Sequence, residues 1–234
     1  MASPVRFPNG VTNVASTVSM GQLVMPDPTK VITYFTDFHT YAAGDWTVTE
    51  TQAGATQALS NAYGAGGVML LTNSAADNDV NQLQLAQEGF KFTAGKKMWF
   101  KTRVQVSDAT QSDLYFGLII TDTDLVGGIT DGVYFRKDDG DAQWDIVSLM
   151  NSSGTSSTNI GTCTAATWTT LAFYYDGGTN LEAWIDEAKV ATLTVALGTT
   201  LVNDEELAVT LSLTNGEAVA KTLAIDYALA VQER

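Results

Sequence analysis

The chain has 234 residues, of which 26 are acidic and 12 are basic, so its formal net charge is −14 at pH 7. This charge repels phosphate groups and anionic lipid headgroups at long range, so we expect neither direct nucleic-acid binding nor a membrane partner. The sequence has no apolar run long enough to span a bilayer and no basic-then-apolar leader, which predicts synthesis in a cytoplasm. The single Cys163 excludes an internal disulfide.

All four prolines lie between Pro4 and Pro28. Proline fixes φ and removes a backbone donor, so it is excluded from helix interiors and central strands. We therefore predict an extended N-terminal arm over 1–30 and one β domain over 31–234. The arm has few charges and many branched aliphatic side chains, unlike a solvated tail. Two interpretations stay open: the arm docks on another subunit, or it folds back as an edge strand on its own domain.

After residue 30 the dominant pattern is alternation with period two, as in KMWFKTRVQVS over 97–107. Further segments of this kind, separated by turn-forming residues, are 113–121, 132–137, 143–150, 170–176, 181–186, 189–195, 206–214 and 222–231. Short strands at this spacing predict an antiparallel β-sandwich. Only 53–63 has any helical pattern.

Residues 168–191, WTTLAFYYDGGTNLEAWIDEAKVA, resemble the paired strands of laminin-G and concanavalin A-like jelly rolls. In those domains a Trp-led strand ends in Tyr-x-Asp-Gly, and the next strand ends in an aromatic-x-Asp-Gly turn. Here the second turn is Asp186-Glu187, which suits the positive φ of a tight hairpin less well. The resemblance implies a jelly-roll β-sandwich over 31–234, with its closing strand in the central sheet.

The opening RFPNGVTN over 6–13, followed by a jelly roll without cysteine pairs, is similar to the head decoration (cement) proteins of tailed bacteriophages. This resemblance implies a structural virion protein that binds the major capsid protein on the capsid exterior and bridges subunits, as a homo-oligomer that we expect to be a trimer. Phe7 would be the apolar anchor of the arm and Arg6 its electrostatic contact. The full set of expected arm contacts is Arg6, Phe7, Val11, Val14 and Val18.

Alternation also directs one set of side chains away from the predicted core. This set comprises Trp99, Arg103, Tyr115, Tyr134, Arg136, Tyr174, Glu182 and Trp184. Aromatic rings mixed with guanidinium groups are typical of a binding surface. The surface could hold a cell-surface glycan by ring stacking, form an oligomer interface, or be covered by 31–90.

Catalysis is disfavoured, and we predict that the chain is not an enzyme. Glycan hydrolysis needs a pair of positioned carboxylates, and the best candidates here are Glu182, Asp186 and Glu187. Alternation sends Glu187 to the opposite face, so a polar strand end is the simpler interpretation. The only histidine, His39, is expected in a surface or capping role. A carbohydrate-binding module is thus the second function hypothesis, and a glycan hydrolase the third.

Calcium is the one cofactor worth weighing, because lectin-like relatives sometimes bind it through loop oxygens. The candidate carboxylate pairs occur in Asp77-Asn-Asp79, Asp122-Thr-Asp124 and Asp138-Asp-Gly-Asp141. None has the spacing of an EF-hand loop. Such pairs arise readily in the turns of an acidic chain, so we predict no cofactor and no metal site.

Overall fold

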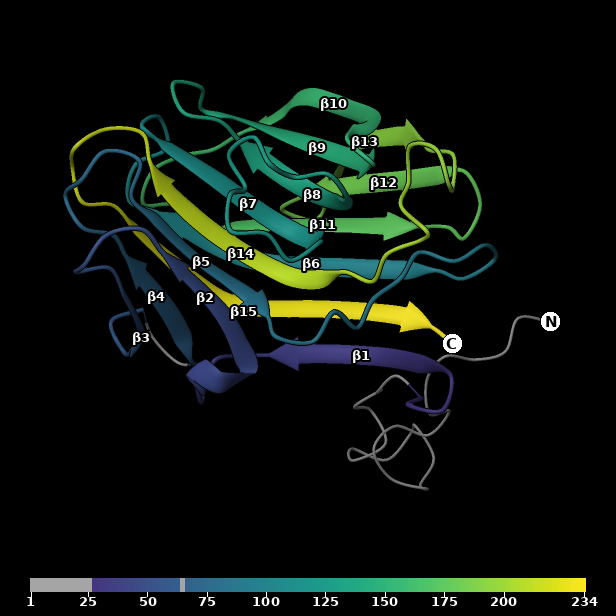
Figure 1. The fold of residues 1–234 in the computed structure, drawn as a ribbon, viewed down its shortest axis with the longest axis horizontal. Helices are drawn as coiled ribbons and strands as arrows, with labels where there is room; N and C mark the ends of the chain where they lie inside the picture. The colour runs from purple at the N-terminus through teal and green to yellow at the C-terminus, as the bar shows by residue number, and fades with distance from the viewer. Residues whose placement is uncertain (1–26, 64–65) are drawn as a thin grey trace.

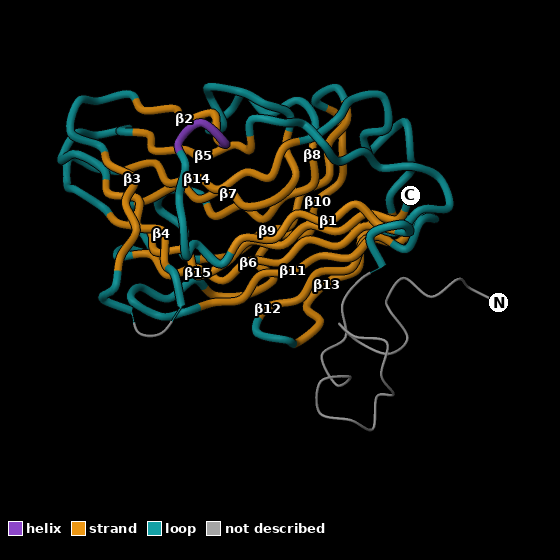
Figure 2. The backbone as a smooth tube through the Cα atoms, turned by 90° about the horizontal axis from the view of Figure 1, so that it is seen from below, coloured by secondary structure: helices purple, strands orange, loops and turns teal. Residues whose placement is uncertain are grey.

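The computed structural model describes residues 27–63 and 66–234, which form a sandwich of two antiparallel β-sheets (Figure 1). Seen from below, the sheets lie as two separate layers (Figure 2). The predicted antiparallel jelly-roll sandwich is confirmed. The five residues predicted to make contacts through the arm lie outside the described residues; they are Arg6, Phe7, Val11, Val14 and Val18.

The first sheet has eight strands. Its order is β13 (Ala188–Thr194), β12 (Asn180–Ile185), β11 (Thr169–Tyr175), β6 (Met98–Val106), β15 (Thr222–Glu233), β4 (Val68–Thr72) and β3 (Thr56–Ser60), and β1 (Val31–Thr36) also pairs with β15. The long β15 serves both partners, since its first residues pair with β4 and its last six with β1. A register shift between Ile225 and Tyr227 separates the two regions.

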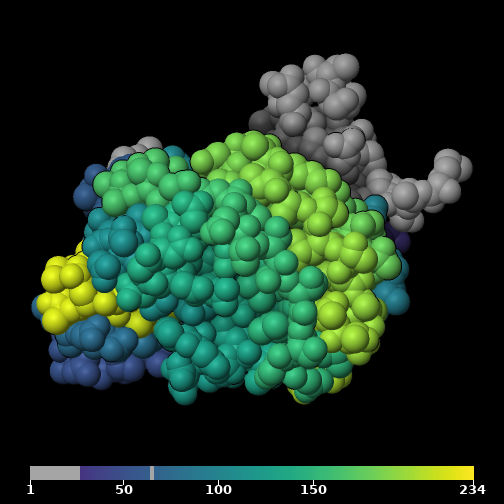
Figure 3. Space-filling view, turned by 90° about the horizontal axis from the view of Figure 1, so that it is seen from above, coloured from purple at the N-terminus to yellow at the C-terminus, as the bar shows by residue number. Residues whose placement is uncertain are grey.

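The second sheet has seven strands. Its order is β10 (Ser153–Thr162), β9 (Gln143–Met150), β8 (Gly132–Lys137), β7 (Ser112–Ile119), β14 (Ala208–Asn215), β5 (Val80–Leu85) and β2 (Trp46–Glu50). A short 3-10 helix, η2 (Ala43–Asp45), precedes β2. The outer strands β10 and β13 of the two sheets lie next to each other. This edge of the sandwich, in green, faces the viewer in Figure 3.

Two possibilities that the sequence left open for the first part of the chain are not realised in the structure. Residues 31–90 do not cover an outer sheet face, because they supply β1 to β5 to the two sheets. The stretch 53–63 is not helical, because Thr56–Ser60 forms β3 and pairs with β4. Pairing with an apolar neighbour thus outweighs the weak local pattern.

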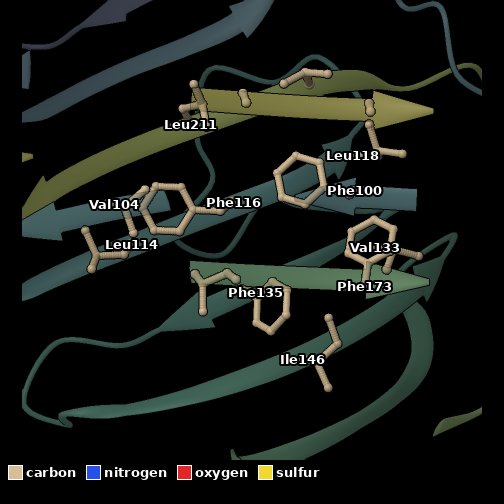
Figure 4. Packing of buried hydrophobic residues seen from close by; sticks show 14 of the residues in the cluster. Phe100, Val104, Leu114, Phe116, Leu118, Val133, Phe135, Ile146, Phe173 and Leu211 are labelled. Atoms are coloured by element: carbon tan, nitrogen blue, oxygen red, sulfur yellow. The ribbon is translucent and has the colours of Figure 1, made fainter. Parts of the chain in front are cut away.

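Phenylalanine rings from both sheets fill the space between them (Figure 4). Phe100 of β6 and Phe173 of β11 stack with ring centroids 5.2 Å apart. In the seven-stranded sheet, Phe116 of β7 lies opposite Phe135 of β8, and both are fully buried. Because successive side chains of a strand alternate, this layer fixes which residues face outward.

The hairpin between β12 and β13 forms despite its sequence. Asp186 and Glu187 both have positive φ, 48° and 65°, which tight two-residue turns require. Asp186 Oδ1 accepts a hydrogen bond from the Thr170 N–H at 2.8 Å, and Glu187 pairs with Lys101 at 2.5 Å. These contacts offset part of the conformational cost that glycine would have avoided.

Over 27–63 and 66–234, no helix is long and apolar enough to cross a bilayer. Cys163 is buried without a disulfide partner, and burial raises the pKa of its thiol to about 11.

The loop before β15 is held by a nearly buried lysine. Lys221, whose side chain is 4% exposed, places Nζ 2.6 Å from Asp108 Oδ2 and 2.5 Å from Glu217 Oε1. Burial opposes ionisation of Asp108, but hydrogen bonds from Lys221 and from the N–H groups of Gln111 and Thr110 outweigh it. Together they lower the pKa of Asp108 to about 2.

We expect this pair to make stability depend on acidity. The pKa of Asp108 is lower in the folded than in the unfolded chain, so its contribution is present above about pH 4 and lost as the pH falls toward 2. The loss amounts to about 2 kcal/mol. Urea unfolding across this range should show the difference between wild type and Asp108→Asn shrinking at low pH. A constant difference would contradict the assignment.

Candidate functional site

The residues predicted to form one outward surface lie on two opposite faces of the sandwich. Trp99, Arg103, Tyr174, Glu182 and Trp184 belong to the eight-stranded sheet. The other three, Tyr115, Tyr134 and Arg136, belong to the seven-stranded sheet. Within each strand, alternation correctly predicted which side chains point outward. The prediction of a single surface is wrong, because which strands share a sheet is decided by pairing between residues far apart in the sequence.

On the eight-stranded sheet, Trp99, Tyr174 and Trp184 form what we call the aromatic patch. Tyr174 of β11 lies directly opposite Trp99 of β6, with ring centroids 5.5 Å apart. Trp184 lies on the same face of the next strand, β12, opposite Ala172 and diagonal to Tyr174. All three side chains are half-buried, so each keeps part of its ring accessible to a partner.

Ion pairs border the aromatic patch. Lys101 pairs with Glu187 at 2.5 Å, and Lys189 pairs with Glu182 at 2.7 Å. An apolar ring surface with a charged rim is typical of the centre of a protein interface. At the far side of the sheet, Phe35 of β1 points the same way and is 59% exposed.

Arg103 lies at one end of the same face, in a second aromatic contact. Its guanidinium lies 4.8 Å from the Trp168 ring and donates to Asp226 Oδ2 at 2.7 Å. Tyr63 meets Trp168 edge-on at 5.7 Å. The Arg103 side chain is thus already held by a ring and a carboxylate, so its role is to fix this end of the face.

On the seven-stranded sheet, Tyr115 and Tyr134 are 4% and 3% exposed. The expectation that they are exposed is wrong, because the loop 120–131 between β7 and β8 folds over them. Leu125 and Ile129 of this loop pack against both tyrosines. We call 120–131 the covering loop.

Two buried glutamines of β5 fasten the covering loop to the sheet. Gln84 accepts the Asp122 N–H at 2.9 Å and donates to the Ile120 carbonyl at 3.1 Å. Gln82 donates to the Asp122 carbonyl at 2.6 Å. Backbone groups of the covering loop thereby satisfy the side-chain amides of both glutamines and the carbonyl oxygen of Gln84.

Beside the covering loop the same face keeps a hollow of about 530 Å³. One wall is apolar and comes mainly from the covering loop, and the other carries carboxylates and Arg136. The lining residues are Asn78, Asp113, Tyr115, Leu125, Val126, Gly127, Ile129, Tyr134, Arg136, Asp138, Asp139 and Leu149. Its volume falls in the range of small-ligand sites.

The candidate hydrolytic carboxylates are each engaged in a structural contact. Glu182 pairs with Lys189 at 2.7 Å, while Asp186 accepts the Thr170 N–H and Glu187 pairs with Lys101. Both hydrolytic mechanisms need one protonated and one free carboxylate across an open site. His39 is exposed and lies 3.0 Å from Asp37, outside both faces described above.

The three loop segments considered for calcium are used by the protein itself. Asp79 accepts the Ser74 N–H at 2.6 Å, and Asp122 accepts the Asp124 N–H at 3.0 Å. Asp138 lies 3.2 Å from Arg136, and Asp141 accepts the Gln143 N–H. No group of three or more His, Cys, Asp or Glu side chains suited to a metal was found in the described part of the chain.

Sequence reasoning missed the covering loop and its fastening. Leu125 and Ile129, two apolar residues within an otherwise polar, glycine-containing segment, were an available signal. Gln82 and Gln84 gave none, because an alternating polar residue in a strand usually faces solvent.

Comparison with known proteins bears on the fold. No protein-family model matches the sequence, and no curated protein matches it. Among solved structures, an endo-1,3-β-glucanase from Streptomyces sioyaensis has a TM-score of 0.61 at 12% identity, covering 89% of this chain and 98% of that chain. Peanut lectin has a TM-score of 0.58 at 12% identity, covering 88% and 98%.

A protein of unknown function from Shewanella oneidensis MR-1 has a TM-score of 0.60 at 12% identity, covering 87% of each chain. The fold is a lectin-like jelly roll. Likeness at this identity shows the fold alone, because lectins and glucanases share it while differing in function.

The fastening of the covering loop can be tested by replacing Gln84. Gln84→Met leaves the Asp122 N–H and the Ile120 carbonyl without their side-chain partner, so we expect a loss of about 2 kcal/mol in unfolding free energy. We also expect faster amide hydrogen exchange within 120–131. Gln105→Met is the matched control, because Gln105 makes one exposed hydrogen bond on the other sheet. Unchanged exchange in 120–131 would contradict the proposed fastening.

Proposed function

We propose that this chain is a structural virion protein that binds the outside of a phage capsid and stabilises it by bridging subunits. The capsid as partner rests on the resemblance of residues 6–13 to decoration proteins. The observation that carries the proposal on the folded domain is the aromatic patch, whose half-buried rings lie on the outer face of the eight-stranded sheet beside two ion pairs.

The position of β1 supports the same proposal. β1 directly follows the N-terminal segment in sequence and pairs with β15 but with no other strand among the described residues. An edge strand of this kind can accept a further strand from a neighbouring chain. Phe35 adds an exposed apolar contact on β1, facing the same way as the aromatic patch.

Stabilisation of a capsid needs only binding that favours the assembled shell. A protein that binds the shell and not its free subunits lowers the free energy of the assembled state, by an amount set by its concentration relative to its dissociation constant. If the protein is a homo-oligomer, as proposed, linked copies gain further through effective concentration. Within this proposal, contact of the arm with the capsid remains a prediction for Arg6, Phe7, Val11, Val14 and Val18.

Carbohydrate binding is the second candidate, and the aromatic patch favours it as well. Indole and phenol rings offer flat apolar surfaces with a polar edge, which suits the face of a sugar ring. The fold is shared with carbohydrate recognition domains such as that of Emp47p, at 14% identity. A glycan array with wild type and Trp99→Ala distinguishes this candidate, since specific binding lost in the variant would favour it.

Co-sedimentation with mature capsids tests the leading proposal. We expect wild type to bind and a Trp99→Ala/Trp184→Ala variant to bind at least about tenfold more weakly, because aromatic anchors dominate interface energies. Val219→Ser is the control, since it removes an exposed apolar side chain from a loop elsewhere.

A chain lacking residues 1–26, the part of the arm that contains all five predicted contacts, separates the arm from the patch. If the truncated chain loses binding while the tryptophan variant keeps it, the contact belongs to the arm, and the capsid is still the partner. Absence of binding by the full chain would contradict the proposal. Thermal unfolding of each variant checks that the fold is retained.

A further inference from the structure

The hollow beside the covering loop has an excess of negative charge. Asp113, Asp138 and Asp139 line it together with one cationic group, Arg136. Arg136 is shared, because its Nε lies 3.2 Å from Asp138 and its Nη2 donates to Asp145 at 2.9 Å. Asp113 and Asp139 have no cationic partner within 4.0 Å among the described residues.

The one nearby lysine does not supply the missing charge. Lys137 lies between Arg136 and Asp138 in sequence, but its side chain points to the core side of β8 and is fully buried. Its ammonium group donates to the carbonyl of Thr110 at 2.8 Å and to that of Ser112. Burial raises the pKa of Asp113, and the carboxylates of Asp139 and Asp138 raise it further. The hydrogen bond that Asp113 Oδ1 accepts from the Asp139 N–H at 2.8 Å and the charge of Lys137 offset only part of this increase.

A second feature of the hollow also points to a ligand. The side chains of Tyr115 and Tyr134 line it and are almost completely buried, yet neither hydroxyl has a hydrogen-bond partner within the described ranges. Burial raises the pKa of Tyr134 to about 12, so its hydroxyl is neutral at physiological pH. Neither hydroxyl oxygen is fully buried, so both can accept a hydrogen bond from a ligand in the hollow.

We propose that this hollow binds an organic cation, a guanidinium or ammonium group, with the carboxylates of Asp113 and Asp139 as counter-ions and the Tyr115 and Tyr134 hydroxyls as further acceptors. The proposal goes beyond the proposed function and does not depend on it. Carboxylates favour cations through charge-assisted hydrogen bonds, and a neutral tyrosine hydroxyl can accept a further hydrogen bond from the same cation.

Other ligand classes fit less well. An anion would face three carboxylates and one guanidinium that is already shared. A neutral sugar ring would need exposed aromatic faces for stacking, and both tyrosine rings are packed beneath Leu125 and Ile129. The cation can be a free small molecule or an arginine or lysine side chain of another protein, and the chemistry is the same for both.

Calorimetric titration of the full chain at low salt tests the proposal with three probes. These are agmatine as a free cation, the amide of Gly-Arg-Gly as a side chain on a peptide, and its neutral citrulline analogue. We expect at least one cationic probe to bind and the citrulline peptide not to bind. Tighter binding of the arginine peptide assigns the site to a partner's side chain, and tighter binding of agmatine assigns it to a free cation.

Variants locate the site. Asp113→Asn and Asp139→Asn should each weaken binding about tenfold, since each removes one counter-ion while keeping the side-chain shape. Tyr134→Phe removes only the hydroxyl and should weaken binding by a smaller factor. Asp204→Asn is the control, because it removes one exposed charge from a distant loop.

Three outcomes would overturn the proposal: no binding of either cation at about 10 mM, equal binding of the citrulline peptide, or equal weakening by Asp204→Asn. Thermal unfolding establishes that each variant is folded at the temperature of the titration.

Discussion

The layer of phenylalanine rings between the two sheets is the constraint on which the rest of the structure depends. Phe100 and Phe173 come from one sheet and Phe116 and Phe135 from the other, and all four are buried. Once these rings point inward, alternation forces their strand neighbours outward. Trp99 and Tyr174 therefore reach one outer face, and Tyr115 and Tyr134 reach the other. Both surfaces discussed above follow from this single packing layer.

The sequence predicted the sandwich class and, apart from β10, the strands from residue 97 onward, because alternation is a local property that a window of ten residues records. It did not predict β1 to β5, whose strands are short and carry polar residues such as Gln82 and Gln84 on a buried face. Those glutamines are buried only because the covering loop lies on them. Which strands share a sheet is also decided by pairing across more than a hundred residues, as between β15 and β6. The single predicted surface therefore divided into two.

The two outer faces differ in a way that suits different partners. The eight-stranded sheet offers half-buried rings beside paired charges, which favours a broad, flat contact. On the seven-stranded sheet the covering loop buries Tyr115 and Tyr134 and leaves an acidic hollow beside it, which favours a small cationic group. A binding protein with a broad contact on one face and a small site on the other is consistent with both proposals. Glu182, Asp186 and Glu187, the carboxylates considered for hydrolysis, each take part in an ion pair or a hairpin contact.

Hydrogen–deuterium exchange of the full chain, alone and mixed with mature capsids, tests the central claim most directly. The account predicts slower exchange in β6, β11 and β12 around Trp99, Tyr174 and Trp184, with β1 protected as well, and little change in the covering loop. Slower exchange confined to 120–131, or no change anywhere with capsids present, would contradict the assignment of the aromatic patch as the contact surface.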